Sequence, residues 1–234
     1  EVKTLAADFS APINRVRWNA EGTLLAVVGY EADVRVFDDQ GKLSKTFKGH
    51  QKDIRHVHWS PDGETLVSLA NDGVILWDVR SSKARHTLSE LSNATCAIYS
   101  PDASQMAVST GDQLAIIDAA SGKSVRSVPV PDGKSVRSLA WNSRGDSILA
   151  TGWYNGWVRW RLSKEPEEAI STMPQYGSGP IRRHPIEPSH AIGYYNGYRG
   201  ADLDWNVIRI VGPSYYFAVG SFSVAHSGGY LSAV

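Results

Sequence analysis

The chain has 234 residues, enough for one or two domains with a buried core. Its 24 basic and 24 acidic side chains cancel to a formal net charge of zero, so no overall field draws it to nucleic acid or to an anionic membrane. No apolar run approaches the roughly 20 residues of a membrane span, and we predict neither direct nucleic-acid binding nor membrane insertion.

The first predicted element is a strand at the N-terminus. The segment EVKTLAAD contains a basic, a hydroxyl and an apolar residue in succession, Lys3, Thr4 and Leu5. The same order recurs in the predicted fourth strands described below. A flexible terminus that matches by chance is the alternative, because such short strand signals are weak.

Four repeated units follow, and each opens with a strand that has the same apolar spacing. The apolar positions are Ile13, Val16 and Trp18; Ile54, Val57 and Trp59; Ala94, Ala97 and Tyr99; and Val136, Leu139 and Trp141. The turns NAEG, SPDG, SPDA and NSRG then lead into the second strands TLLAVVG, ETLVSLA, SQMAVST and DSILATG. Third strands end at Phe37, Trp77, Ile117 and Trp160, and fourth strands carry KTF at 45–47, HTL at 86–88 and RSV at 126–128. Each unit is therefore predicted to be a four-stranded antiparallel sheet.

The repeat period identifies the architecture. The aromatic residue that closes the first strand recurs after 41, 40 and 42 residues, close to the roughly 40 to 45 of a four-stranded propeller blade. In the second unit, Gly49-His50 and Trp77-Asp78 resemble the signature of the WD-repeat family. The resemblance covers about residues 1–162, and the other units match mainly by period.

The WD-repeat resemblance implies a fold and a set of structural residues. The fold would be an all-β β-propeller of four-stranded antiparallel blades, four recognisable, followed by an irregular C-terminal β segment. Residues 1–7 would supply the outer strand that closes the ring. His50, Ser68, Asp72 and Trp77 would form a buried hydrogen-bond network in one blade. Because Ser68 lies within a strand with no cleft signal around it, we predict no catalytic residue and no enzyme.

Residues 163–234 break the regular pattern. Five of the eleven prolines lie between Ser163 and His190, whereas HAIGYYNG, WNVIRIVG and SYYFAVGSFSV are rich in aromatic and β-branched residues and indicate strands. The tail either supplies further degenerate blades, with the Pro-rich stretch as an insertion, or begins a separate domain. We favour blades, about five to six in total by length.

Metal and cofactor sites are not predicted. RRHPI at 182–186 and YRGAD at 198–202 faintly resemble the zinc-site region of lysostaphin-type peptidases, but Tyr198 stands at the position of a ligand His and only His226 follows. A degenerate zinc-peptidase-like segment is therefore only a remote alternative. His56 and His58 lie outside the repeated apolar positions and are expected to be solvated. No glycine-rich phosphate loop is present, so we predict no cofactor.

Binding through the faces of the ring remains. Loops that join fourth to first strands, and second to third strands, would gather on one rim, where function usually resides. The candidate partner-binding residues there are Tyr30, Glu31, Asp53, Asn71, Gln113, Trp153, Tyr154 and Trp157. The three aromatic residues of GWYNGW are either interface anchors or packing between blades.

We predict a non-catalytic scaffold that binds other proteins within a multi-subunit complex. The alternative is a reader of a peptide or modified side chain at the central channel, which an aromatic and acidic cluster at the channel mouth would mark. Cys96 is the only cysteine, and no charged-then-apolar leader opens the chain. We therefore expect an intracellular protein, cytoplasmic or nuclear.

Overall fold

The computed structural model describes residues 9–111, 113–130, 136–152 and 157–162, followed by short strands between residues 170 and 232. The chain divides into two compact units, Glu1–Val130 and Pro131–Val234. The strand predicted at residues 1–7 lies outside the described residues.

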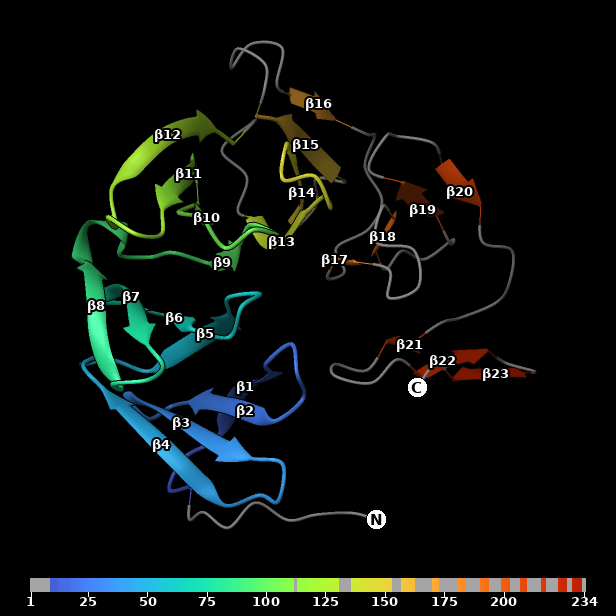
Figure 1. Ribbon diagram of the computed structural model, residues 1–234. Helices are drawn as coiled ribbons and strands as arrows, with labels where there is room; N and C mark the ends of the chain where they lie inside the picture. The colour runs from blue at the N-terminus through green and yellow to red at the C-terminus, as the bar shows by residue number, and fades with distance from the viewer. Residues whose placement is uncertain are drawn as a thin grey trace. The chain divides into compact units, whose positions relative to one another are not determined.

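The first unit contains three four-stranded antiparallel sheets (Figure 1). The first sheet is β1 (Ile13–Trp18), β2 (Leu24–Gly29), β3 (Asp33–Asp38) and β4 (Leu43–Lys48). The second is β5 (Ile54–Trp59), β6 (Thr65–Ala70), β7 (Gly73–Asp78) and β8 (Lys83–Leu88). A 3-10 turn at Ser89–Leu91 leads to the third, β9 (Cys96–Tyr99), β10 (Gln105–Ser109), β11 (Gln113–Asp118) and β12 (Ser124–Pro129). Strand order follows chain order, as the repeat predicts.

The second unit begins with a sheet of the same kind. It is formed by β13 (Val136–Trp141), β14 (Ser147–Gly152), β15 (Trp157–Arg161) and β16 (Ile170–Thr172). A further sheet contains β17 (Ile181–Arg183), β18 (His190–Gly193), β19 (Arg199–Asp202) and β20 (Val207–Arg209), and a three-stranded sheet contains β21 (Tyr216–Phe217), β22 (Ser223–His226) and β23 (Gly229–Ser232). Both β16 and β17 fall within the Pro-rich stretch that we expected to be an insertion. Four four-stranded blades over residues 13–172 confirm the predicted fold class.

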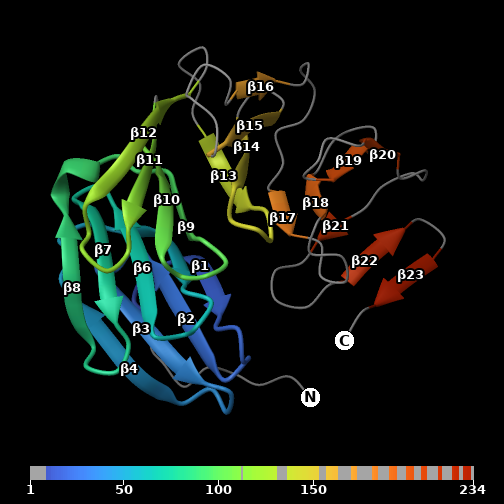
Figure 2. The same ribbon diagram turned by 45° about the horizontal axis from the view of Figure 1, so that its top comes forward.

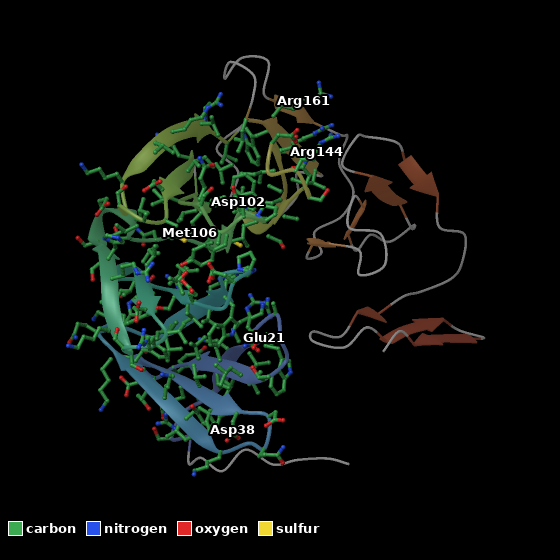
Figure 3. The ribbon with its side chains drawn as sticks, in the orientation of Figure 1. Glu21, Asp38, Asp102, Met106, Arg144 and Arg161 are labelled. Atoms are coloured by element: carbon green, nitrogen blue, oxygen red, sulfur yellow. The ribbon has the colours of Figure 1, made fainter. Side chains whose placement is uncertain are left out.

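Within the first unit, the sheets pack through their apolar faces. Phe47 of the first sheet shares a buried cluster with Trp59 and Trp77 of the second. The opposite face of the second sheet contributes Leu76 to a cluster that contains Met106 of the third sheet (Figure 3). Because both of its faces are covered, all six residues of β6 are buried and its sequence TLVSLA reads as a nearly continuous apolar run.

The first strands β1, β5 and β9 are neighbours in succession. The fourth strands β4, β8 and β12 form the other edge of each sheet, as Figure 2 shows from a second direction. The first strands therefore form the inner edge of this unit, and the fourth strands its outer edge.

Acidic residues at the ends of the third strands stabilise the turns that follow them. Asp78 accepts hydrogen bonds from the backbone N–H of Ser81 at 2.8 Å and from its hydroxyl at 2.7 Å, and Arg85 donates at 2.9 Å. These three donors, in that order, hold the pKa of Asp78 well below its usual range. Asp118 accepts the same two bonds from Ser121, and Asp38 lies at the equivalent turn (Figure 3).

Replacing Gly73 by alanine tests the tight β6–β7 turn. Gly73 has φ 130°, and a Cβ built there would lie 2.7 Å from the Leu88 carbonyl oxygen. We expect Gly73→Ala to lower the free energy of unfolding by about 3 kcal/mol or more, because backbone strain and a steric clash combine. Urea denaturation followed by tryptophan fluorescence measures this change.

Gly63→Ala is the matched control. Gly63 also has a left-handed φ, 71°, but nothing lies within 4 Å of a Cβ at that position, so the substitution should cost about 1 kcal/mol. Equal losses for the two variants would show that the close approach to Leu88 is not a constraint.

Candidate functional site

The β4–β5 loop and the β6–β7 turn meet at one end of the second sheet. His50 Nδ1 lies 2.7 Å from Asp72 Oδ1, and the backbone N–H of Gln51 donates to Asp72 Oδ2 at 2.6 Å. We call this end of the sheets the rim: it comprises the loops from fourth to first strands and from second to third strands. Asp72 therefore clamps two rim loops together.

The network implied by the WD-repeat resemblance runs inward from this clamp. The Trp77 indole N–H donates to Ser68 Oγ at 2.7 Å, and Ser68 Oγ lies 2.8 Å from His50 Nε2. A carboxylate only accepts, so the partners assign the proton to His50 Nδ1 and make Nε2 the acceptor of the Ser68 hydroxyl. His50, Ser68, Asp72 and Trp77 thus form one continuous chain of donors and acceptors.

The geometry of the network indicates a structural role. Ser68 is fully buried and Trp77 is 1% exposed, so the serine hydroxyl has no route to a substrate. Gly49 makes room for the indole, because a Cβ there would lie 2.8 Å from Trp77 Cη2. The sequence Gly49-His50 is therefore explained by packing and hydrogen bonding against Trp77.

Two opposing effects set the pKa of Asp72. Partial burial raises the pKa, but the hydrogen bonds from Gln51 N–H and from His50 outweigh it, so the pKa lies below its ordinary value. The carboxylate is therefore charged in the folded protein under neutral conditions and binds both rim loops.

The first sheet has an equivalent clamp that the sequence reasoning missed. The backbone N–H of Ser10 donates to Glu31 Oε1 at 2.9 Å, and the Ser10 hydroxyl donates to the same oxygen at 2.6 Å. The hydroxyl bond is the main reason that the pKa of Glu31 lies below its ordinary value. Glu31 also pairs with Arg35 at 2.6 Å, and the Arg35 guanidinium lies 4.8 Å from the centre of the Phe9 ring.

Apolar residues replace the buried hydrogen bonds in this first sheet. Phe9 stands 41 residues before His50, and its ring lies 5.9 Å from that of Phe37, the counterpart of Trp77. Val27, 41 residues before Ser68, is fully buried in the same cluster. The repeat period could have located this second clamp, because Glu31 stands 41 residues before Asp72.

In the first unit, the candidates Tyr30, Glu31, Asp53 and Asn71 lie on these rim loops, and Gln113 is the first residue of β11. Tyr30 is 56% exposed, and its backbone N–H donates to the Pro12 carbonyl at 3.0 Å. Asp53, Asn71 and Gln113 are exposed, whereas Glu31 is half-buried in its clamp. Trp153 and Tyr154 lie outside the described residues; Trp157 begins β15, but its side chain is not described.

The expectation that His56 and His58 are solvated is wrong. His56 is 5% exposed, and its Nε2 lies 3.9 Å from the Sγ of buried Cys96. His58 is half-buried, with its ring 6.4 Å from that of Tyr99. Both side chains face the third sheet, because the face of β5 opposite the repeated apolar positions is also covered.

The first strands lack the acidic residues expected for a reader of a peptide or modified side chain at the central channel. None of β1, β5, β9 and β13 contains an Asp or Glu, whereas Arg15, Arg17 and Arg55 are present. The aromatic and acidic cluster expected for the channel reader is thus not found on the described first strands.

Among the described residues, no group of three or more His, Cys, Asp or Glu side chains could hold a metal ion. No helix in that part of the chain is long and apolar enough to cross a membrane.

Ser68→Ala tests the buried network. Removal of the hydroxyl leaves the Trp77 N–H and His50 Nε2 without their partner, so we expect a loss of about 2 to 4 kcal/mol in the free energy of unfolding. Ser44→Ala, at an exposed position on β4, should stay within about 0.5 kcal/mol of the unchanged protein in the same urea titration. Indistinguishable midpoints for the two variants would contradict the assigned role of Ser68.

Asp72→Asn tests the charge of the clamp. A carboxyl whose folded pKa lies below its unfolded value, about 3.9, stabilises the fold above that pH, and the stabilisation is lost as pH falls through the folded pKa. Because Asp72 is partly exposed, we expect the variant to lose about 1 kcal/mol at neutral pH. The difference should shrink towards zero in acid, as measured by denaturant titrations across pH. A constant difference at every pH would rule out this electrostatic account.

Residues 41–78, which span the β3–β4 turn to the end of β7, match the family model for the WD domain, G-beta repeat. The chain is 31% identical over 159 residues to WD repeat-containing protein AAC3 of Dictyostelium discoideum, an alignment that covers 57% of this chain and 33% of that protein. It is 29% identical over 158 residues to small ribosomal subunit protein RACK1 of Drosophila melanogaster, covering 62% and 49% of the two chains.

A third relative is the transcriptional corepressor LEUNIG_HOMOLOG of Arabidopsis thaliana, 38% identical over 74 residues, or 31% of this chain and 9% of that protein. The chain spans less than half the length of each of these relatives. Residues 41–78 are therefore a WD repeat, and the chain builds four-stranded sheets at the same period on either side of it.

Proposed function

We propose that this chain is a non-catalytic platform that binds other proteins through its rim, as a subunit of a larger assembly. The observation that carries the proposal is the exposure of Tyr30, 56%, on a loop that the Glu31 clamp fixes in place. A large side chain with an apolar ring and a polar tip is the kind of residue that anchors protein interfaces.

Rigidity of the rim supports the same function. Asp72 and Glu31 each bind the backbone of a neighbouring loop, and both carboxyl groups have lowered pKa values. Loops that are fixed before binding lose little conformational entropy when a partner docks. The clamps thus favour binding without reorganisation.

The relatives favour an assembly subunit. One is named as a protein of the small ribosomal subunit and another as a transcriptional corepressor. We extend to this chain only what these names share, a role carried out together with other macromolecules. A cytoplasmic or nuclear location goes with this proposal, and the single buried free thiol of Cys96 is compatible with it.

Tyr30→Ser tests the rim. We expect it to lower the recovery of co-purifying proteins about tenfold or more from the source cells, because a truncated anchor commonly costs at least 2 kcal/mol of binding energy. Quantitative mass spectrometry of the tagged chain and its bound proteins measures the loss.

Val125→Ser is the matched control, since Val125 is also 56% exposed but lies on the outer strand β12. It should retain the bound proteins. Equal recovery with Tyr30→Ser and Val125→Ser, at equal melting temperature, would refute binding through the rim.

A further inference from the structure

The turns between third and fourth strands differ in charge, although they stand at the same point of the repeat. The turn after β3, DDQGK at 38–42, has two acids and one lysine, and the turn after β11, DAASGK at 118–123, has one of each. The turn after β7, DVRSSK at 78–83, has one acid and two bases, Arg80 and Lys83. The second sheet therefore has a cationic turn between two turns that are acidic or neutral.

Two further cations are held at the β7–β8 turn. The Lys45 ammonium group donates to the Arg80 carbonyl at 3.3 Å, which joins β4 of the first sheet to this turn of the second. Arg85 Nη2 lies 2.9 Å from Asp78 Oδ2, and Lys83 is the ladder partner of Asp78. The strands β4 and β8 are neighbours on the outer side of the unit (Figure 1). We call Lys45, Arg80, Lys83 and Arg85 the outer basic patch.

Two acids adjoin the outer basic patch. Asp78 pairs with Arg85, and the Glu64 carbonyl accepts a backbone hydrogen bond from the residue after Asp78. Among the described residues, the Asp78–Arg85 contact is the one ion pair that involves the patch. Arg80 and Lys83 are exposed. Four cations against two acids therefore leave an excess of positive charge at an accessible surface.

The turn that carries the patch is fixed before any partner binds. Asp78 accepts hydrogen bonds from the backbone N–H and the hydroxyl of Ser81, and the Ser82 N–H donates to the Asp78 carbonyl at 2.9 Å. The bond from Lys45 supports the same turn from the neighbouring sheet. A surface held in this way loses little conformational entropy when a partner docks.

We infer that the outer basic patch binds an acidic segment of a partner protein, one with several Asp or Glu side chains in succession. Carboxylates complement the excess positive charge, and the exposed Arg80 guanidinium can donate two parallel hydrogen bonds to one of them. The patch lies at the end of the sheets opposite the rim, on the turn between third and fourth strands. It is therefore a second binding surface, beyond the proposed function.

The extent of the patch favours a short acidic segment over a nucleic acid. The acidic and neutral turns on either side confine the excess charge to one turn, whereas a nucleic-acid backbone is charged along its whole length and is bound through many cation–phosphate contacts. The turn at 78–83 also has no aromatic residue on which a base could stack.

The test compares two double variants that remove the same charge. Arg80→Gln with Lys83→Gln alters the patch. Lys42→Gln with Lys123→Gln is the control, because these exposed lysines stand 41 residues before and 40 residues after Lys83, at the same point of the repeat. The probe is a short fluorescent Gly/Ser peptide with four consecutive glutamates, and the reference peptide has glutamines instead. Fluorescence anisotropy at low ionic strength gives the affinities, and melting temperatures verify folding.

We expect the unchanged protein and the control variant to bind the glutamate peptide more tightly than the glutamine peptide. The patch variant should bind the glutamate peptide about fivefold more weakly, because two exposed ion pairs are lost. Added salt should reduce this difference, since it screens exposed charges. If the patch variant fails to fold, Lys83→Gln alone should still weaken binding about twofold.

Equal affinity of both double variants for the glutamate peptide would overturn the inference, as would equal affinity of the unchanged protein for the two peptides. Tighter binding of a single-stranded RNA oligonucleotide, or of phosphatidylserine vesicles, than of the glutamate peptide would also overturn it. The proposed function fails separately. Tyr30→Ser should keep full affinity for the glutamate peptide, and the proposed function stands if that variant loses co-purifying proteins even where the glutamate peptide does not bind.

Discussion

Each sheet of the first unit is too small to fold alone, so it must bury both of its faces against its neighbours. The second sheet shows the result, since all six residues of β6 are buried between two apolar clusters. Within such an interior, a polar side chain is costly unless its donors find acceptors. Ser68 satisfies this condition because Trp77 and His50 bind it from two sides.

The same burial constraint is met by two different chemistries at equivalent positions. In the second sheet, hydrogen bonds join His50 to Ser68 and Asp72, whereas in the first sheet Phe9 packs on Phe37. The backbone clamp to an acid in the turn between second and third strands is common to both, at 2.6 Å and 2.9 Å. Both sheets therefore bind the loop before the first strand to an acidic residue and fill the sheet interior beneath that loop. The histidine network is one way to fill this interior, and the packing of Phe9 on Phe37 is another.

The period of the repeat predicted the strands of residues 13–161 because large apolar residues at fixed spacing must face neighbouring sheets. The repeat gave a wrong expectation for His56 and His58. Its apolar positions mark only one face of β5, so the other face was expected to be exposed to solvent, but the third sheet covers that face. The short strands β16 and β17 were also missed, because strands of three residues depend on pairing partners more than on their own composition. Closure of a ring by residues 1–7 stays a prediction.

Net charge proved a poor guide to the local surface, for a physical reason. Many of the acids lie in turns, where Asp78 and Asp118 accept backbone and hydroxyl hydrogen bonds that hold their pKa values low. The same residues are thereby committed to shaping the chain. The described first strands contain arginines and no acids, so positive charge at the rim end of β1 and β5 is left without an internal counterpart. A chain with zero net charge can therefore carry local positive charge, because part of its negative charge is engaged in shaping the turns.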